Sequence, residues 1–241
     1  MKPDYPKAIW RPAANANVSD RPASARIDCV VLHATAGGLM GTLAWFENPN
    51  SGVSAHYVAA KDGKMFQMVE EIKRAHHAGS SNFQGRTNFN DFSIGIEIVN
   101  KNDGKDPYPA DQFEAMVELM SYLVARYDIQ REWVVTHADI STVGKTDPRG
   151  FPVVDLLSRV YDPAANLPDD VVREAAWNAS GIPFNPTAAF PKYARKHDLG
   201  NPQTREFDFT YKGVNYRGQG FSGAIVYCLV GDWDDLREMS W

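Results

Sequence analysis

Runs of apolar residues divide the first half of the chain into short strands. Residues 26–35 and 93–100 are nearly continuously apolar, which is typical of interior strands that are covered on both faces of a sheet. The apolar runs at residues 53–60 and 65–69 are separated by a short polar stretch with Asp62-Gly63, which strongly favours a β-hairpin. These segments predict a mixed sheet.

An apolar stripe with a helical period runs through residues 108–127, the longest predicted helix. The stripe consists of Phe113, Met116, Val117, Met120, Leu123 and Val124. Asp111 and Glu114 lie in the first turn, where the helix dipole favours acidic side chains. Shorter helices are predicted at residues 42–48, 151–161 and 169–178. Strands alternating with helices define an α/β protein, with a central mixed β-sheet flanked by helices.

Shifts in composition divide the chain into parts. Residues 1–25 are rich in Pro, Ala and Asn and predict an extended arm, which Trp10 anchors to the first domain. We expect this domain to comprise residues 1–161. Residues 162–168 have the composition of a linker, and residues 169–241 predict a small α+β C-terminal module.

Charge and hydropathy exclude several classes of function. The chain has 241 residues and a net charge of -5, which argues against nucleic acid as a partner. No run approaches the roughly 18 apolar residues of a membrane span. The N-terminus lacks the apolar core of a secretory signal, so we expect synthesis in the cytoplasm. Cys29 and Cys228 are interpreted as buried small hydrophobes rather than a disulfide, and the chain as a monomer.

Three residues suggest a metal site. His33 and His137 each follow a short apolar run, at residues 30–32 and 133–135, and Asp147 comes ten residues after His137. Two histidines and one aspartate would give a Zn²⁺ site with one open position, as a hydrolase needs. A histidine at the end of a strand is more often structural, and an aspartate before proline is a common turn residue. Spacing alone leaves both interpretations open.

Two charged residues strengthen the catalytic interpretation. Glu97 is embedded among apolar neighbours, and a buried carboxylate needs either a cationic partner or a metal-bound water. In the second case it would accept a proton from the water and pass it to the leaving amine. Lys145, two residues before Asp147, could stabilise an oxyanion, or it could be a solvated loop lysine.

Six segments between residues 26 and 157 resemble the zinc-dependent N-acetylmuramoyl-L-alanine amidase type 2 family. In the order of the family they are VVLHAT at 30–35, SAHYVAAKDGKMFQMV at 54–69, HHAGSS at 76–81, SIGIEIV at 93–99, THADI at 136–140 and KTDPRG at 145–150. The resemblance implies the type 2 amidase fold. It also implies hydrolysis of the amide bond between N-acetylmuramic acid and L-alanine in peptidoglycan.

The resemblance also implies a role for each residue that matches a motif. His33, His137 and Asp147 fall on the zinc ligands of the family. Lys145 falls on the lysine that stabilises the transition state. Glu97 falls on the catalytic glutamate of the recycling-type members.

Two further histidines match residues of the family near the substrate, and both are expected to bind it. His56 falls on a histidine near the site that is not a ligand, and His77 falls on a histidine of the substrate groove.

Three positions depart from the pattern. Asp147 stands where several phage and animal members use cysteine. Ala55 replaces a tyrosine that some phage members use in catalysis, which leaves more of the chemistry to Glu97. Val153 stands where the family often has tryptophan.

The C-terminal module is weakly similar to the LGFP-type repeats of bacterial cell-wall proteins. The similarity lies at residues 199–206, 216–221 and 223–227, the last of which is expected to pair in a hairpin with the segment after Asp232. It implies a wall-binding module whose aromatic residues stack on sugar rings. The aromatic residues are Phe184, Tyr193, Tyr216, Phe221, Tyr227 and Trp233. The alternative is that these residues form the core of a small domain.

The favoured function is a zinc amidase that cleaves peptidoglycan as a phage-type endolysin, made in the cytoplasm and acting on the cell wall. The C-terminal module favours this function over a cytoplasmic amidase that recycles anhydro-muropeptides, because small soluble substrates require no wall anchor. A non-catalytic peptidoglycan recognition protein is the alternative from another class. Such proteins usually lack a metal ligand, whereas all three candidate ligands are present here.

Overall fold

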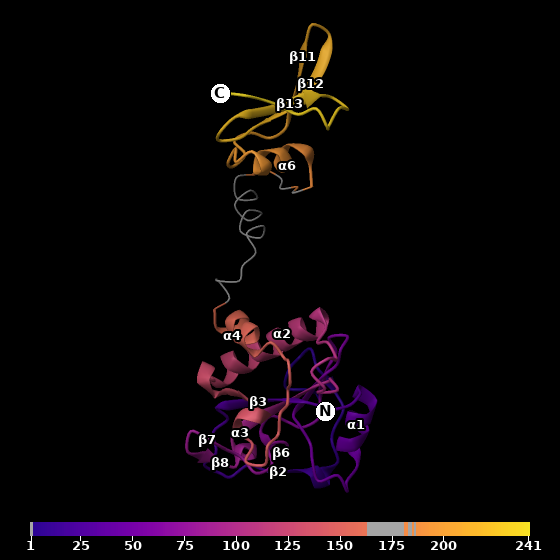
Figure 1. Cartoon of the computed structure of the whole chain (residues 1–241), viewed down its shortest axis with the longest axis vertical. Helices are drawn as coiled ribbons and strands as arrows, with labels where there is room; N and C mark the ends of the chain where they lie inside the picture. Colours follow the sequence, from indigo (N-terminus) through magenta and orange to yellow (C-terminus); the bar gives the residue numbers. More distant parts are fainter. Residues whose placement is uncertain (1, 163–180, 183–184, 186) are drawn as a thin grey trace. The chain divides into compact units, whose positions relative to one another are not determined.

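The computed structural model describes residues 2–162, 181–182, 185 and 187–241. The chain divides into two compact units, Met1–Asn166 and Leu167–Trp241 (Figure 1). Most of the expected linker and the whole helix predicted at residues 169–178 lie outside the described residues.

A six-stranded mixed sheet forms the centre of the first unit, as predicted. The strands, in spatial order, are β1 Ile9–Trp10, β5 Met65–Gln67, β4 Tyr57–Ala59, β9 Ser93–Ile98, β3 Cys29–Ala34 and β10 Val134–Thr136. The predicted hairpin, β4 with β5, is the antiparallel pair, and the remaining neighbours are parallel. The parallel strands β9, β3 and β10 therefore end at the same edge of the sheet.

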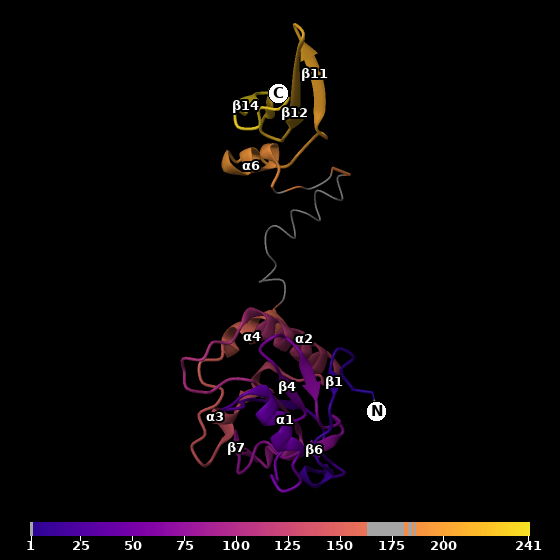
Figure 2. The same ribbon diagram turned by 90° about the vertical axis from the view of Figure 1, so that its right-hand side faces the viewer.

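Helices cover both faces of this sheet. Helices α2 (Ala110–Tyr127) and α4 (Val153–Tyr161) pack together on one face, while α1 (Leu39–Glu47) and α3 (His137–Ile140) lie on the other (Figure 2). Because side chains alternate along a strand, even-numbered residues of β3 and β9 join the core beneath α2 and α4. Odd-numbered residues of the same strands face α1 and α3, and these include the candidate site residues of both strands.

The buried face of α2 differs from the predicted stripe. Its buried residues are Gln112, Met116, Leu119, Met120 and Leu123. Three residues of the predicted stripe, Phe113, Val117 and Val124, pack only partly buried against the core. The polar Gln112 is buried because its side-chain amide donates to the carbonyls of Ala59 (2.9 Å) and Val99 (3.1 Å).

The N-terminal arm is more ordered than the prediction of an extended segment. It supplies edge strand β1 and a further strand β2 (Val18–Asp20), which pairs with β6 (Lys73–Ala75). Tyr5, Ala13 and Asn17 are buried, whereas Trp10 is only half-buried. The remaining short elements are β7 Asn82–Phe83, β8 Arg86–Thr87 and the 3₁₀ helices Asn15–Asn17, Phe89–Asp91 and Arg131–Trp133.

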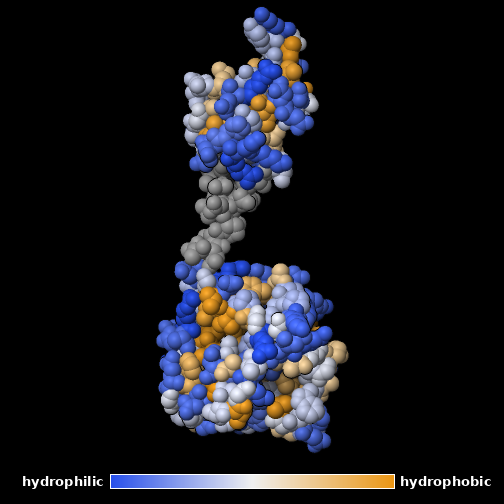
Figure 3. All heavy atoms as spheres, in the orientation of Figure 1, coloured by the Kyte–Doolittle hydropathy of each residue, from blue (hydrophilic) through white to orange (hydrophobic). Residues whose placement is uncertain are grey.

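The second unit is a small α+β structure, as predicted. Helix α6 (Ala189–Lys196) packs on an antiparallel sheet of β11 Phe207–Tyr211, β12 Val214–Gly220, β13 Ile225–Leu229 and β14 Arg237–Met239. Strands β13 and β14 form the hairpin expected beyond residue 223. Phe221 belongs to the core of this unit. Hydrophobic side chains are exposed along β11 and β12 (Figure 3).

Cys29 and Cys228 are both buried and free, as predicted. Within the described part of the chain, no helix combines the length and apolar character that a membrane crossing requires. Of the aromatic residues predicted to bind sugar, Phe184 lies outside the described residues.

Candidate functional site

Three side chains meet at the edge of the sheet where the parallel strands end. His33 lies near the end of β3, and His137 directly follows the neighbouring parallel strand β10. A capping box between Thr136 and Asp139 fixes the start of α3, which orients His137. The backbone carbonyl of Asp147 accepts a hydrogen bond of 3.0 Å from Ala138, which brings the loop back to the histidine. Parallel pairing thus unites residues that are more than a hundred positions apart.

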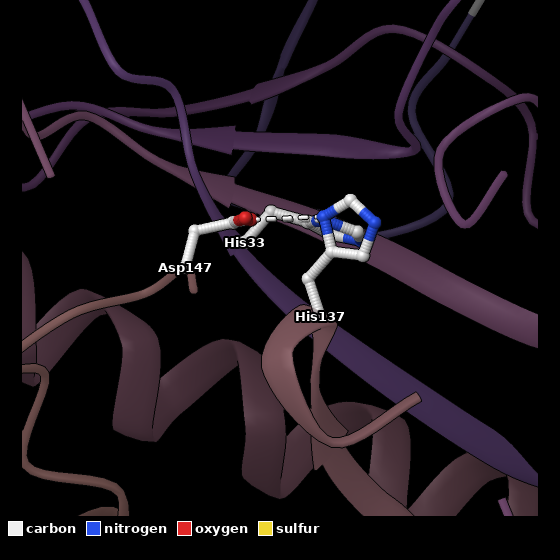
Figure 4. Close-up of side chains that lie close together, drawn as sticks. All are labelled: His33, His137 and Asp147. Carbon is white, nitrogen blue, oxygen red and sulfur yellow. Dashed lines mark hydrogen bonds and ion pairs between the residues drawn. The ribbon is translucent and has the colours of Figure 1, made fainter. Parts of the chain in front are cut away.

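The three side chains present one candidate ligand atom each, and these atoms all lie within 4.8 Å of one another. Oδ2 of Asp147 is 3.0 Å from Nδ1 of His137 and 3.5 Å from Nδ1 of His33 (Figure 4). All three residues are buried. Two imidazoles and a carboxylate are the donor set that Zn²⁺ takes in hydrolytic sites, so the residues fit this metal.

The electrostatics of the cluster favour the protonation states that metal binding needs. Burial lowers the pKa of His33 to about 4, so its imidazole is neutral at pH 7. Burial alone would raise the pKa of Asp147, but the hydrogen bond with His137 and the nearby ring of His33 outweigh it and hold that pKa well below its usual range. A neutral imidazole and an ionised carboxylate are both ready to coordinate a cation.

Glu97 lies beside this cluster, because β9 is paired with β3 in a register that places Glu97 opposite His33. Its Oε2 is buried and has no hydrogen-bond partner, and no ion pair to Glu97 occurs among the described residues. Burial raises the pKa of Glu97 to about 8, with a further contribution from the charge of Asp147. The described residues therefore do not supply the salt bridge that was the alternative explanation for this carboxylate.

The three candidate ligands line an open cavity of about 660 Å³. Its lining also includes Glu97 and Lys145. Lys145 is solvent-exposed, and its backbone N–H is bound by Ser141 Oγ at 3.2 Å, so only its side chain is free to reach into the cavity. The side chain of Lys145 is therefore available to a molecule bound in the cavity.

The two histidines predicted to contact substrate lie in different surroundings. His77 lines the cavity, with Nδ1 3.0 Å from Nε2 of His33. His56 is 0% exposed and lies outside the cavity lining. Its Nδ1 accepts from the backbone N–H of Gly95 at 2.9 Å, and Nε2 lies 3.1 Å from the carbonyl of Lys73. The prediction that His56 contacts substrate does not agree with this burial, since both of its nitrogens are satisfied inside the protein.

One wall of the cavity was not predicted from the sequence. Trp45, on α1, lines the cavity and is 53% exposed. Its neighbours Leu43 and Phe46 are buried against the sheet. A large aromatic residue between two positions that point into the core of a short helix is the signal that could have identified this wall.

A mixed sheet that brings two imidazoles and a carboxylate to one edge, beside an unpaired glutamate in an open cavity, is an arrangement that metal-dependent hydrolases use. More specifically, the chain belongs to the N-acetylmuramoyl-L-alanine amidase family, Amidase_2, which matches residues 23–150. The match contains every candidate site residue and lies within the first unit.

Individual relatives agree with this family. The chain is 36% identical to N-acetylmuramoyl-L-alanine amidase A of Achromobacter lyticus over 124 residues, which are 51% of this chain and 64% of the relative. It is 37% identical to amidase AmiD of Escherichia coli K12 over 137 residues, which are 51% of this chain and 49% of the relative. The chain thus spans less than two thirds of the length of these curated relatives.

Solved structures support the fold. A selenomethionine derivative of AmpD superposes with a TM-score of 0.58 at 28% identity, covering 66% of this chain and 99% of that chain. AmiD from E. coli, in complex with anhydro-N-acetylmuramic acid-L-Ala-D-γ-Glu-L-Lys, superposes with a TM-score of 0.52 at 30% identity. That match covers 60% of this chain and 66% of AmiD. The first unit therefore has the type 2 amidase fold.

Proposed function

We propose that the chain is a zinc-dependent amidase that hydrolyses the bond between the lactyl group of N-acetylmuramic acid and L-alanine in peptidoglycan. The observation that carries the proposal is the meeting of His33, His137 and Asp147 beside the unpaired carboxylate of Glu97, inside an open cavity. Family membership and the muropeptide bound by the relative AmiD support this choice of substrate.

In this proposal His33, His137 and Asp147 hold the metal. Zn²⁺ held by these residues would supply Lewis-acid polarisation of the amide carbonyl and would lower the pKa of the attacking water. Glu97 takes the proton from the water as the C–O bond forms, and then delivers it to the amide nitrogen as the C–N bond breaks. Lys145 donates a hydrogen bond to the oxygen that becomes negative in the tetrahedral intermediate. The products are the lactyl carboxylate and a stem peptide with a free L-alanine amine.

The supporting evidence for Glu97 as the proton carrier is its environment. A carboxyl whose pKa lies near neutrality can exchange protons with both water and an amine, whereas an ordinary glutamate is too acidic to protonate an amine efficiently. Because Ala55 provides no phenol at the position where some phage members have tyrosine, no second proton carrier competes with Glu97 at that position.

The proposed substrate is the intact cell wall, with residues 169–241 as a wall-binding module. The separate second unit and the hydrophobic side chains exposed on β11 and β12 support this use. The second candidate is a recycling amidase for anhydro-muropeptides. It is favoured by relatives such as 1,6-anhydro-N-acetylmuramyl-L-alanine amidase AmpD of Haemophilus influenzae, 41% identical over 97 residues.

Digestion of purified peptidoglycan tests the proposal, with mass analysis of the released peptides. The zinc-loaded chain should release stem peptides that begin with L-alanine, and a chelator should stop the release until zinc is restored. Glu97→Gln is the matched control, because it keeps the shape and the candidate ligands but cannot carry the proton. Sedimentation with the walls without any release would show a recognition protein instead. Parallel digestion of anhydro-muropeptides separates lysis from recycling.

A further inference from the structure

The two ring nitrogens of His33 face different partners. Nδ1 is directed toward Oδ2 of Asp147 at 3.5 Å (Figure 4), whereas Nε2 lies 3.0 Å from Nδ1 of His77. The two rings meet edge to face, with an interplanar angle of 83°. A metal-binding histidine usually donates its second ring N–H to a carboxylate or a carbonyl. Here the neighbour is another imidazole, which could accept or donate, so its own hydrogen bonds decide the direction.

The position of His77 is fixed from two sides. Its backbone N–H donates to Oδ1 of Asn90 at 2.9 Å. Its ring lies directly against the backbone of Gly95, where an added Cβ would be only 2.4 Å from Cγ of His77. A glycine inside a buried strand marks a close approach of this kind. His77 therefore occupies a space that any other residue at position 95 would fill.

The hydrogen bond between Ser93 and Phe89 sets the direction of the hydrogen bonds that link Ser93, His77 and His33. Oγ of Ser93 lies 2.5 Å from the carbonyl oxygen of Phe89, and a carbonyl can only accept. The single hydroxyl proton of Ser93 is used there, so its oxygen accepts from Nε2 of His77, 3.3 Å away. A neutral imidazole with its proton on Nε2 presents a lone pair at Nδ1. Hence His77 accepts a hydrogen bond from Nε2–H of His33.

We infer that the relay from His33 through His77 and Ser93 to the carbonyl of Phe89 sets the tautomer of His33, so that Nδ1 carries the lone pair offered to the metal. His77 is a positioning residue of the metal site. The inference deepens the proposed function, on which it rests, and it differs from the predicted role of His77 as a substrate contact.

Nitrogen-15 NMR of the metal-free full chain, labelled at its six histidines, tests the relay directly. Two-bond proton–nitrogen correlations distinguish the two neutral tautomers. In the wild type we expect His33 and His77 both to carry the proton on Nε2. A proton on Nδ1 of His33 would overturn the inference. Ser93→Ala removes the terminal acceptor and should convert His77 to a mixture of tautomers, whereas an unchanged His77 spectrum would also contradict the relay.

Zinc affinity, measured by competition with a chromophoric chelator, gives a second readout. His77→Leu and His77→Asn are nearly equal in shape, but only asparagine places an acceptor oxygen where Nδ1 stands. We expect a loss of about 10- to 100-fold in zinc affinity for leucine and recovery to within a few-fold for asparagine. Equal affinities of the two variants would refute the positioning role. Circular dichroism checks that each variant is folded, and Ser93→Ala provides the test if His77→Leu does not fold.

These measurements separate the inference from the proposed function. The tautomers and the zinc affinity are read without any turnover. A chain with the expected tautomers that releases no stem peptide would refute the amidase proposal and leave the relay in place. A chain that cleaves peptidoglycan with His33 protonated on Nδ1 would refute the relay alone.

Discussion

Replacing Glu97 with glutamine should stabilise the metal-free protein and strongly slow amide hydrolysis. Oε2 of Glu97 is buried without a partner, and burial raises the pKa of this carboxyl from 4.5 to about 8. An acidic group with a raised folded-state pKa disfavours the folded state at every pH above its unfolded value. The penalty starts near pH 4.5, grows with pH, and becomes constant above about pH 8. Glutamine removes this penalty because it has no charge.

The size of the effect follows from the two pKa values. Each pH unit between the unfolded value and the pH of measurement contributes about 1.4 kcal/mol, so at pH 7 the penalty is about 3 kcal/mol. A buried amide without partners costs about 1–3 kcal/mol in turn. We therefore expect Glu97→Gln to raise the free energy of unfolding by about 0–2 kcal/mol at pH 7, and to lower the rate of amide hydrolysis by about 10²- to 10⁴-fold.

Urea unfolding of the wild type and Glu97→Gln, both without metal and at several pH values from 4.5 to 8, measures this prediction. Subtracting the two unfolding free energies cancels the contributions of all groups that the two proteins share. The remaining difference should increase with pH. A difference that is independent of pH would show that Glu97 is not desolvated in the folded state. A variant that is less stable at pH 7 would show that the carboxylate has a partner in solution.

Four further predictions follow from the described contacts. Lys145→Gln should lower kcat by about 10²-fold without changing the unfolding midpoint, because Lys145 is exposed; unchanged kcat in steady-state assays would refute its role. His56→Leu leaves two backbone groups unpaired and should cost about 2–4 kcal/mol in urea unfolding, whereas a selective rise in KM would restore its predicted substrate contact. Gly95→Ala should displace the ring of His77, cost about 1–3 kcal/mol, and weaken zinc binding in a competition titration; wild-type affinity would contradict the close packing. Removing Leu167–Trp241, which has its own core, should weaken cosedimentation with cell walls and leave muropeptide turnover intact. Equal sedimentation of both chains would argue against a wall-binding module.

The sequence predicted the layout of the site because its signals are local. Apolar runs that end in histidine located His33 and His137, and parallel pairing of their strands explains why these residues meet. The isolated acid in an apolar strand located Glu97, since burial of a charge is costly wherever the strand lies. The resemblance to the family, carried by six ordered segments, assigned these residues their roles.

Other features depend on contacts that a linear pattern does not encode. The buried face of α2 includes Gln112 only because two strand carbonyls lie within its reach. His56 and His77 have the same predicted role, yet one is enclosed by backbone groups and the other faces the cavity. Their difference arises from the packing of Gly95 and its neighbours in three dimensions. A polar residue's environment is therefore predictable only when the partner elements are known.

The pairing of β3 with β10 has a consequence for how the protein acquires its metal. Residues 33 and 137 come into range only when the two strands are side by side, which requires the intervening chain to have closed into its crossover. A partly folded chain offers at most a single imidazole with the nearby aspartate. High-affinity zinc uptake would thus follow pairing of the two strands, and the bound ion would link the two ends of the long connection between β3 and β10. A higher zinc concentration should then make separation of β3 and β10 rarer, since a ligand bound only by the folded state stabilises that state by mass action.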